Sequence, residues 1–306
     1  MRLIMIHGRG QEEENDKDLK QTWIDTLNKG IENAKSVFDD MKNAVPISED
    51  IVQIEFPFYG RLIYELVYVD KNKQTIVEAR RSSSYIPNEA KEIDYFESFL
   101  GEIADHVDMP RGERAELMNF RGQKRGILNW DIVQRLLVFL DDNKIGNELT
   151  LRAVTKDVYL YLRVNSIKAA INELVEKSFD KNDPCVVVGH SLGSIVSYLV
   201  LKNNPDYKVE KYITVGSPLG LKSVKDYLDG SLEMPKCVNK TNGWFNAYDE
   251  ADFVALNPLD KKYFNIQPHI ENKNDVKNQM SNHHGIQGYL NDAVVARMIY
   301  KALFPQ

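Results

Sequence analysis

Short apolar runs alternate along the chain with longer stretches in which apolar residues recur every three or four positions. An uninterrupted apolar run, rich in β-branched residues, is typical of a strand buried on both faces. The wider spacing is typical of a helix with one buried side. These patterns predict strands at residues 3–6, 51–56, 185–188, 211–215 and 244–248. Because helices separate the strands, the sequence indicates an α/β protein.

The helical spacing predicts helices at 19–38, 165–179 and 291–303, and one that follows residue 194. Asn165 or Ser166 is suited to cap the helix at 165–179, because a short polar side chain can accept a hydrogen bond from a free backbone N–H group.

About a hundred residues lie between the strand at 51–56 and the helix at 165–179, far more than an ordinary connection needs. We expect residues 61–162 to form a large, mainly helical cap inserted into a core of residues 1–60 and 163–306. Within the cap, helices are predicted at 88–106, 130–140 and 154–162. The aromatic residues of the cap could form a lid over an apolar pocket or simply pack against the core. Both can hold, and packing is the more common role of any single aromatic residue.

A chemical motif follows the strand at 185–188. Residues 189–193 read Gly-His-Ser-Leu-Gly, and helical spacing begins at Ile195. A serine between a strand and a helix occupies a strained turn, and flanking glycines let the chain fold back tightly. The turn presents the hydroxyl of Ser191 at the start of a helix, whose dipole favours nearby negative charge. In this context the motif resembles the nucleophile turn of the α/β-hydrolase superfamily, and within it the lipase- and esterase-like members.

The resemblance implies a mostly parallel sheet with helices on both faces. The sheet would be trimmed at the N-terminus, since the strand at 3–6 begins almost at the first residue. The sequence His7-Gly8-Arg9-Gly10 resembles the oxyanion loop of that superfamily. Backbone N–H groups of Arg9 and Leu192 would then bind the negative oxygen of a tetrahedral intermediate.

The same resemblance places a catalytic acid after the strand at 244–248, where three carboxylates lie close together. The order Asp, apolar residue, Val at 252–254 resembles the usual position of that acid. Asp252 is therefore favoured, with Asp249 as the second candidate and Glu250 as the third.

A catalytic histidine is expected in the loop before the helix at 291–303. His284 is favoured over His283, because Tyr289 and Leu290 resemble the residues that follow this histidine in the family. The order Ser191, Asp252, His284 is the order expected for the fold. Two adjacent histidines could instead bind a metal, but no carboxylate or cysteine at ligand spacing favours this.

Composition narrows the class of protein. The chain of 306 residues is 43% hydrophobic and 27% charged, as in an ordinary globular protein, and its net charge of −6 argues against nucleic-acid binding. Cys185 and Cys237 are too few for a disulfide framework. Because neither a signal peptide nor a membrane span is apparent, we expect a cytoplasmic location. Basic residues at 111–126 could contact phosphate or an acidic membrane surface, but a solvated loop is the simpler interpretation.

Together these resemblances imply a serine hydrolase that cleaves a carboxylic ester, with a hydrophobic or lipid acyl group, and that needs no cofactor. Ser191 would be the nucleophile, His284 the general base, and Asp252 the residue that orients the imidazole. The alternatives are a binding or signalling protein on a hydrolase scaffold, and an acyltransferase or amidase that uses the same residues.

Overall fold

The computed structural model describes residues 1–8, 15–60, 62, 89–106, 138, 148–228, 230–239, 241, 243–278 and 283–305. Arg9 and the basic residues at 111–126 lie outside the described residues, and so does nearly all of the helix predicted at 130–140. The division into a core and an inserted cap stays a prediction.

In the described part of the chain, one parallel sheet has the strand order β2-β1-β3-β4-β5-β6. The strands are β1 (Arg2–Ile6), β2 (Gln53–Glu55), β3 (Cys185–His190), β4 (Val209–Val215), β5 (Trp244–Ala247) and β6 (Glu271–Lys273). All five predicted strands are confirmed, and the mostly parallel sheet is parallel throughout these strands. Among the described strands only β6 was not predicted, because its residues Glu-Asn-Lys form no apolar run.

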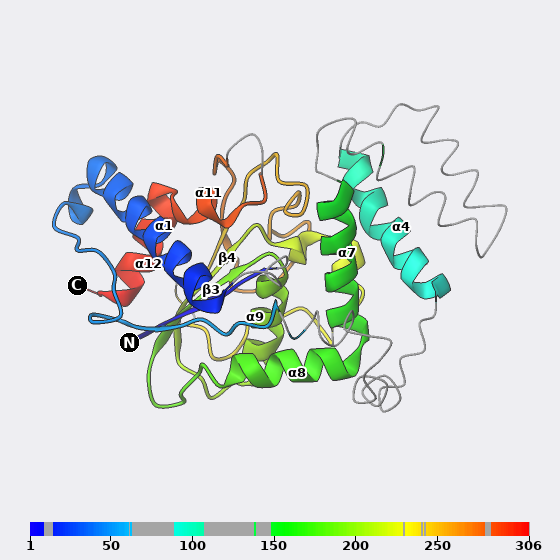
Figure 1. Ribbon diagram of the computed structural model, residues 1–306, viewed down its shortest axis with the longest axis horizontal. Helices are drawn as coiled ribbons and strands as arrows, with labels where there is room; N and C mark the ends of the chain where they lie inside the picture. The colour runs from blue at the N-terminus through cyan, green and yellow to red at the C-terminus, as the bar shows by residue number, and fades with distance from the viewer. Residues whose placement is uncertain are drawn as a thin grey trace.

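Helices cover both faces of the sheet (Figure 1). On one face lie α1 (Asp16–Val37), α11 (Ile286–Leu290) and α12 (Ala293–Leu303), which share a buried apolar cluster with the sheet. On the other face lie α4 (Glu89–His106), α7 (Glu148–Arg163), α8 (Asn165–Glu176), α9 (Leu192–Asn203) and α10 (Lys222–Lys225). Two short 3₁₀ turns, η1 (Asp39–Met41) and η2 (Pro218–Gly220), complete the described elements.

The strands β1, β3, β4 and β5 divide their apolar side chains between the two apolar clusters. In β1, Leu3 and Met5 belong to the cluster beneath α1 and α12, whereas Ile4 and Ile6 belong to the cluster on the opposite face. None of these four side chains is exposed. A strand covered on both faces needs apolar residues at successive positions, which is why these runs are continuous in the sequence.

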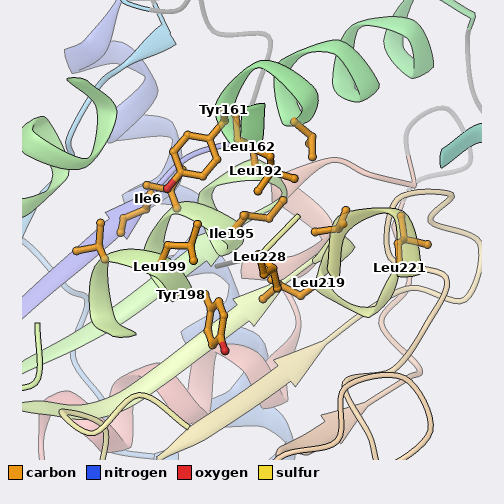
Figure 2. Close-up of a cluster of buried hydrophobic side chains, with 14 of the residues drawn as sticks. Ile6, Tyr161, Leu162, Leu192, Ile195, Tyr198, Leu199, Leu219, Leu221 and Leu228 are labelled. Atoms are coloured by element: carbon orange, nitrogen blue, oxygen red, sulfur yellow. The ribbon is translucent and has the colours of Figure 1, made fainter. Parts of the chain in front are cut away.

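The cluster beneath α9 joins the sheet to the neighbouring helices. Figure 2 shows Ile6, at the end of β1, lying near Leu192 of α9 and near Tyr161 and Leu162 of α7. The helices α4 and α7 confirm the helices predicted at 88–106 and 154–162, although α7 begins earlier than predicted. None of the described helices is both long enough and apolar enough to cross a lipid bilayer.

Helix caps agree with the sequence in part. Asp292 accepts hydrogen bonds from the N–H groups of Val294 and Val295 at the start of α12. The cap predicted for α8 at Asn165 or Ser166 is wrong, because Val164 occupies the cap position and makes no side-chain cap. Val164 is the single residue between α7 and α8 and is buried in the apolar cluster, so packing at this corner overrides the preference for a polar cap.

The two cysteines are buried and unpaired. Cys185 begins β3, and the thiol of Cys237 donates a hydrogen bond to the carbonyl oxygen of Leu201. Burial raises the pKa of both thiols to about 12. The thiolate form is therefore disfavoured at both positions.

A carboxylate attaches α4 to the segment that follows β4. The two side-chain oxygens of Glu102 accept hydrogen bonds from the N–H groups of Lys222 and Ser223, at 2.7 and 2.6 Å. These N–H groups lie at the start of α10, where no helical acceptor is available to them.

We expect Glu102→Ala to lower the free energy of unfolding by about 1 kcal/mol, because it leaves two N–H groups of α10 without this acceptor. Urea denaturation would measure the loss, and amide hydrogen exchange would locate it in α4 and α10. Lys91→Ala, which shortens an exposed side chain on the same helix, is the control. Equal losses in the two variants would contradict the specific role of Glu102.

Candidate active site

Ser191 lies in a strained turn between β3 and α9. Its φ is 54° and its ψ is −127°, and no other non-glycine residue in the described part of the chain has a positive φ. The turn is held at both sides of the residue. The Ser191 N–H donates to the carbonyl oxygen of Val215, and its own carbonyl oxygen accepts from the N–H and Oγ–H of Ser194. Such strain persists only where the surroundings enforce it.

Close backbone packing requires the glycines on either side of this serine. A Cβ atom at Gly193 would lie 2.1 Å from the carbonyl oxygen of Ile6 and 2.5 Å from that of His7. A Cβ atom at Gly189 would lie 2.6 Å from Oγ of Ser197. The first turn of α9 therefore packs directly on the ends of β1 and β3. A side chain at Gly193 would push α9 away from β1, and one at Gly189 would push α9 away from β3.

Gly8 brings the loop after β1 against the serine. A Cβ atom at Gly8 would lie 2.7 Å from Cβ of Ser191. This is the loop in which the sequence places oxyanion-binding N–H groups, but Arg9 itself lies outside the described residues. Leu192, the other predicted donor, is the first residue of α9, so its N–H group has no acceptor within the helix.

Three predicted side chains meet in one hydrogen-bonded chain. Nε2 of His284 lies 2.7 Å from Oγ of Ser191, and Nδ1 lies 2.8 and 3.0 Å from the two carboxyl oxygens of Asp252. All three residues are buried, with exposed fractions of 1% for Ser191, 8% for His284 and 0% for Asp252. Because a carboxylate can only accept, Nδ1 carries the proton in the neutral ring, and Nε2 is left to accept from the Ser191 hydroxyl.

Asp252 is held by two further donors. The N–H group of Val254 donates to Oδ1 at 2.9 Å, and the hydroxyl of Tyr289 donates to Oδ2 at 2.6 Å. These bonds orient the carboxylate toward His284 and satisfy its buried oxygens. In the sequence Tyr289 helps only to choose between two histidines, and no pattern predicts this contact, which joins residues 37 positions apart.

The other acidic candidates lie elsewhere. Asp249 pairs with His283 at 3.1 Å and also accepts from the N–H groups of Ala251 and Asn278. Glu250 accepts from the side chain of Asn274 at the surface. The structure thus brings Asp252 and His284 to Ser191, while Asp249 and His283 form a separate pair beside them.

His190, within the Gly-His-Ser motif, ties the histidine loop to the serine turn. Its Nε2–H group donates to the carbonyl oxygen of His284 at 2.9 Å, and the two rings lie 4.9 Å apart. Burial, and secondarily the nearby His284, lower the pKa of His190 to about 3. The ring is therefore neutral and adds no positive charge beside His284.

His7 fixes the end of β1 in a similar way. Its Nε2 accepts from the N–H group of Tyr59 at 3.1 Å, and its Nδ1–H donates to the carbonyl oxygen of Gly8 at 2.6 Å. The Tyr59 hydroxyl donates to the carbonyl oxygen of His7, and the two rings stack with centroids 4.1 Å apart. Burial lowers the pKa of His7 to about 4. The sequence places His7 in the loop motif, but no pattern in it predicts these contacts.

Comparison with known proteins agrees with the parallel sheet and its flanking helices. The family model described as a PGAP1-like alpha/beta domain matches residues 154–257, about a third of the chain, and this is a family of lipase/esterase-type α/β hydrolases. Together with the parallel sheet and its flanking helices, this match fits an α/β-hydrolase superfamily. The matched span of this hydrolase fold contains Ser191 and Asp252, whereas His284 lies beyond it. No curated protein and no solved structure matches the chain.

The neutral histidines at positions 7 and 190 make the stability of the fold depend on pH. Both have folded-state pKa values well below the ordinary 6.5, so the unfolded chain takes up protons first as the pH falls. Their contribution to the free energy of unfolding is complete above about pH 6.5. Below that pH it is lost progressively, at about 1.4 kcal/mol per pH unit for each histidine. We expect the free energy of unfolding to fall by about 2 kcal/mol between pH 6 and pH 5.

Urea denaturation at several pH values would measure this slope. In His7→Gln, whose amide oxygen can still accept from Tyr59, the slope should fall to about half of the wild-type value. Arg297 lowers the pKa of Asp40 below 3.8, and Lys273 does the same for Asp275. Protonation of these carboxyl groups therefore affects stability at pH values below this range. A wild-type stability that is flat from pH 6 to pH 5 would contradict neutral burial of these rings.

Proposed function

We propose that the protein is a serine hydrolase that cleaves a carboxylic ester through an acyl-enzyme. The observation that carries this proposal is the unbroken chain of hydrogen bonds from the Ser191 hydroxyl through His284 to Asp252. The strained turn at Ser191 and the match to a hydrolase domain support the same reaction. A simple surface serine would need neither the strain nor the buried histidine–carboxylate pair.

The arrangement accounts for each proton in the reaction. Nε2 of His284 takes the Ser191 proton as Oγ bonds to the ester carbonyl carbon, and Asp252 stabilises the imidazolium that forms. The imidazolium then protonates the departing alkoxide as the carbon–oxygen bond of the ester breaks. In the second half, His284 takes a proton from water, which attacks the acyl-enzyme, and returns that proton to Ser191.

Negative charge develops on the carbonyl oxygen in both halves of this reaction. The N–H group of Leu192 at the start of α9 is one proposed donor, and a backbone N–H group at Arg9 is the other. Each such donor is commonly worth about 3 kcal/mol of barrier lowering. The contact between Gly8 and Ser191 supports this assignment, because it brings the loop after β1 to the side of the nucleophile.

Apolar surroundings favour a hydrophobic acyl group. The ring of Phe253 lies 5.8 Å from the ring of His284, and Leu192 and Leu162 belong to the apolar cluster next to the serine turn. Apolar side chains with a few fixed polar groups are the usual lining of a small-molecule site. We therefore propose a hydrophobic ester, including a lipid ester, as the substrate class.

Labelling with a fluorophosphonate probe tests the nucleophile. We expect the wild-type protein to be labelled covalently and Ser191→Ala to remain unlabelled. His284→Ala should lower the labelling rate at least a hundredfold, because general-base assistance is commonly worth about 10² to 10⁴. His283→Ala is the matched control and should be labelled nearly as fast as wild type. A folded wild-type protein that resists the probe would contradict the proposal.

Replacing Asp252 or Asp249 by asparagine tests which of the two carboxylates acts on the catalytic histidine. We expect Asp252→Asn to lower kcat/KM for a p-nitrophenyl ester by about 10⁴, because an amide in this place favours the wrong imidazole tautomer. Asp249→Asn should lower kcat/KM less than tenfold, since Asp249 contacts His283 rather than His284. The reverse order of effects would assign the acid to Asp249.

A further inference from the structure

The hydroxyl of Tyr289 has a fixed direction. Its oxygen accepts from the N–H group of Asp249 at 3.2 Å, and its proton is directed to Oδ2 of Asp252 at 2.6 Å. An ionised carboxylate cannot donate, so the hydroxyl is the donor in the shorter bond. The side chain is fully buried at the end of α11, a few residues after His284.

This hydroxyl acts on the same oxygen that faces the histidine. Oδ2 of Asp252 accepts from Tyr289 and is also the nearer oxygen to Nδ1 of His284, at 2.8 Å. We propose that Tyr289 is a positioning residue for the proposed hydrolase reaction, which holds Asp252 toward His284 and moderates the negative charge that the imidazole meets. The inference rests on the proposed function, because it concerns how the acid acts on the base.

The packing around Tyr289 leaves room for its contact with Asp252. A Cβ atom at Gly216, whose φ is 55°, would lie 3.0 Å from Cε2 of Tyr289 and 3.1 Å from Oδ2 of Asp252. Glycine at this position therefore leaves room for the ring and the carboxylate to meet. Burial, followed by the charge of Asp252, raises the pKa of Tyr289 well above its ordinary value, so the hydroxyl stays protonated and donates.

Two rings pack beside His284. The ring of His190 is neutral and that of Phe253 is apolar. Asp249 pairs with His283, the residue before His284. Removal of the Tyr289 hydroxyl therefore changes the charge that reaches His284 chiefly through Asp252. A carboxylate that has lost a donor stabilises the neighbouring imidazolium more strongly, so His284 should hold its proton to higher pH.

The test compares Tyr289→Phe with Tyr198→Phe. Tyr198 is the matched control, because its fully buried side chain also accepts one bond and donates one through its hydroxyl, in both cases with the backbone of Glu233. Both variants lose a buried hydroxyl, but only one of them touches Asp252. Two quantities are measured in each protein, namely the titration of the His284 ring by NMR and the pH dependence of fluorophosphonate labelling.

We expect Tyr289→Phe to raise the midpoint of the His284 titration by about one pH unit. The midpoint of labelling should rise with it, and the limiting rate should fall about tenfold, as expected for one lost bond to a charged group. Tyr198→Phe should change neither midpoint. An unchanged His284 titration in folded Tyr289→Phe, or an equal shift in Tyr198→Phe, would overturn the inference.

Two further results keep the test decisive. A wild-type protein that resists the probe would contradict the proposed function alone, because the His284 titration still measures the effect of Tyr289. If Tyr289→Phe does not fold, the Tyr289 hydroxyl proton of the wild-type protein is observed by NMR instead. A slowly exchanging Tyr289 proton with a nuclear Overhauser effect to Nδ1–H of His284 supports the shared oxygen, and an assigned hydroxyl proton without that effect overturns it.

Discussion

Direct backbone contact between the end of β1 and the first turn of α9 determines where Ser191 can lie. Gly193 packs against the carbonyl oxygens of Ile6 and His7, so closely that no room is left for a side chain. This contact sets the path of the turn after β3 and brings Gly8 to Ser191. Because β1 and β3 are neighbours on either side of the point where the strand order reverses, the site lies where open parallel sheets bind their ligands.

The loops around the serine behave as one unit because their connections are short and buried. His190 joins the serine turn to the backbone of His284, and Tyr289 joins the helix after that histidine to both Asp252 and Asp249. Each bond links residues that are far apart in the sequence. The geometry of Ser191, His284 and Asp252 is therefore a property of the whole sheet edge, and no single loop sets it alone.

The sequence was informative where the constraint is local. Continuous apolar runs identified the buried strands, and the motif around Ser191 identified the turn, because a strained serine needs glycines at fixed positions beside it. It was uninformative where contacts are long-range. The polar edge strand β6, the buried corner at Val164 and the bond from Tyr289 to Asp252 follow from packing between distant segments. For the adjacent histidines the resemblance favoured His284 over His283, and in the structure His284 faces Asp252 while His283 faces Asp249.

The buried state of both cysteines has a practical consequence for chemical biology. Many electrophilic reagents react with thiolates as readily as with activated hydroxyls, so an exposed cysteine would compete for them. The chain contains only Cys185 and Cys237, and burial raises the pKa of each thiol to about 12. Covalent inhibitor libraries can therefore be screened on the native protein without masking its thiols, and the protein should tolerate peroxide at concentrations that inactivate thiol-dependent enzymes.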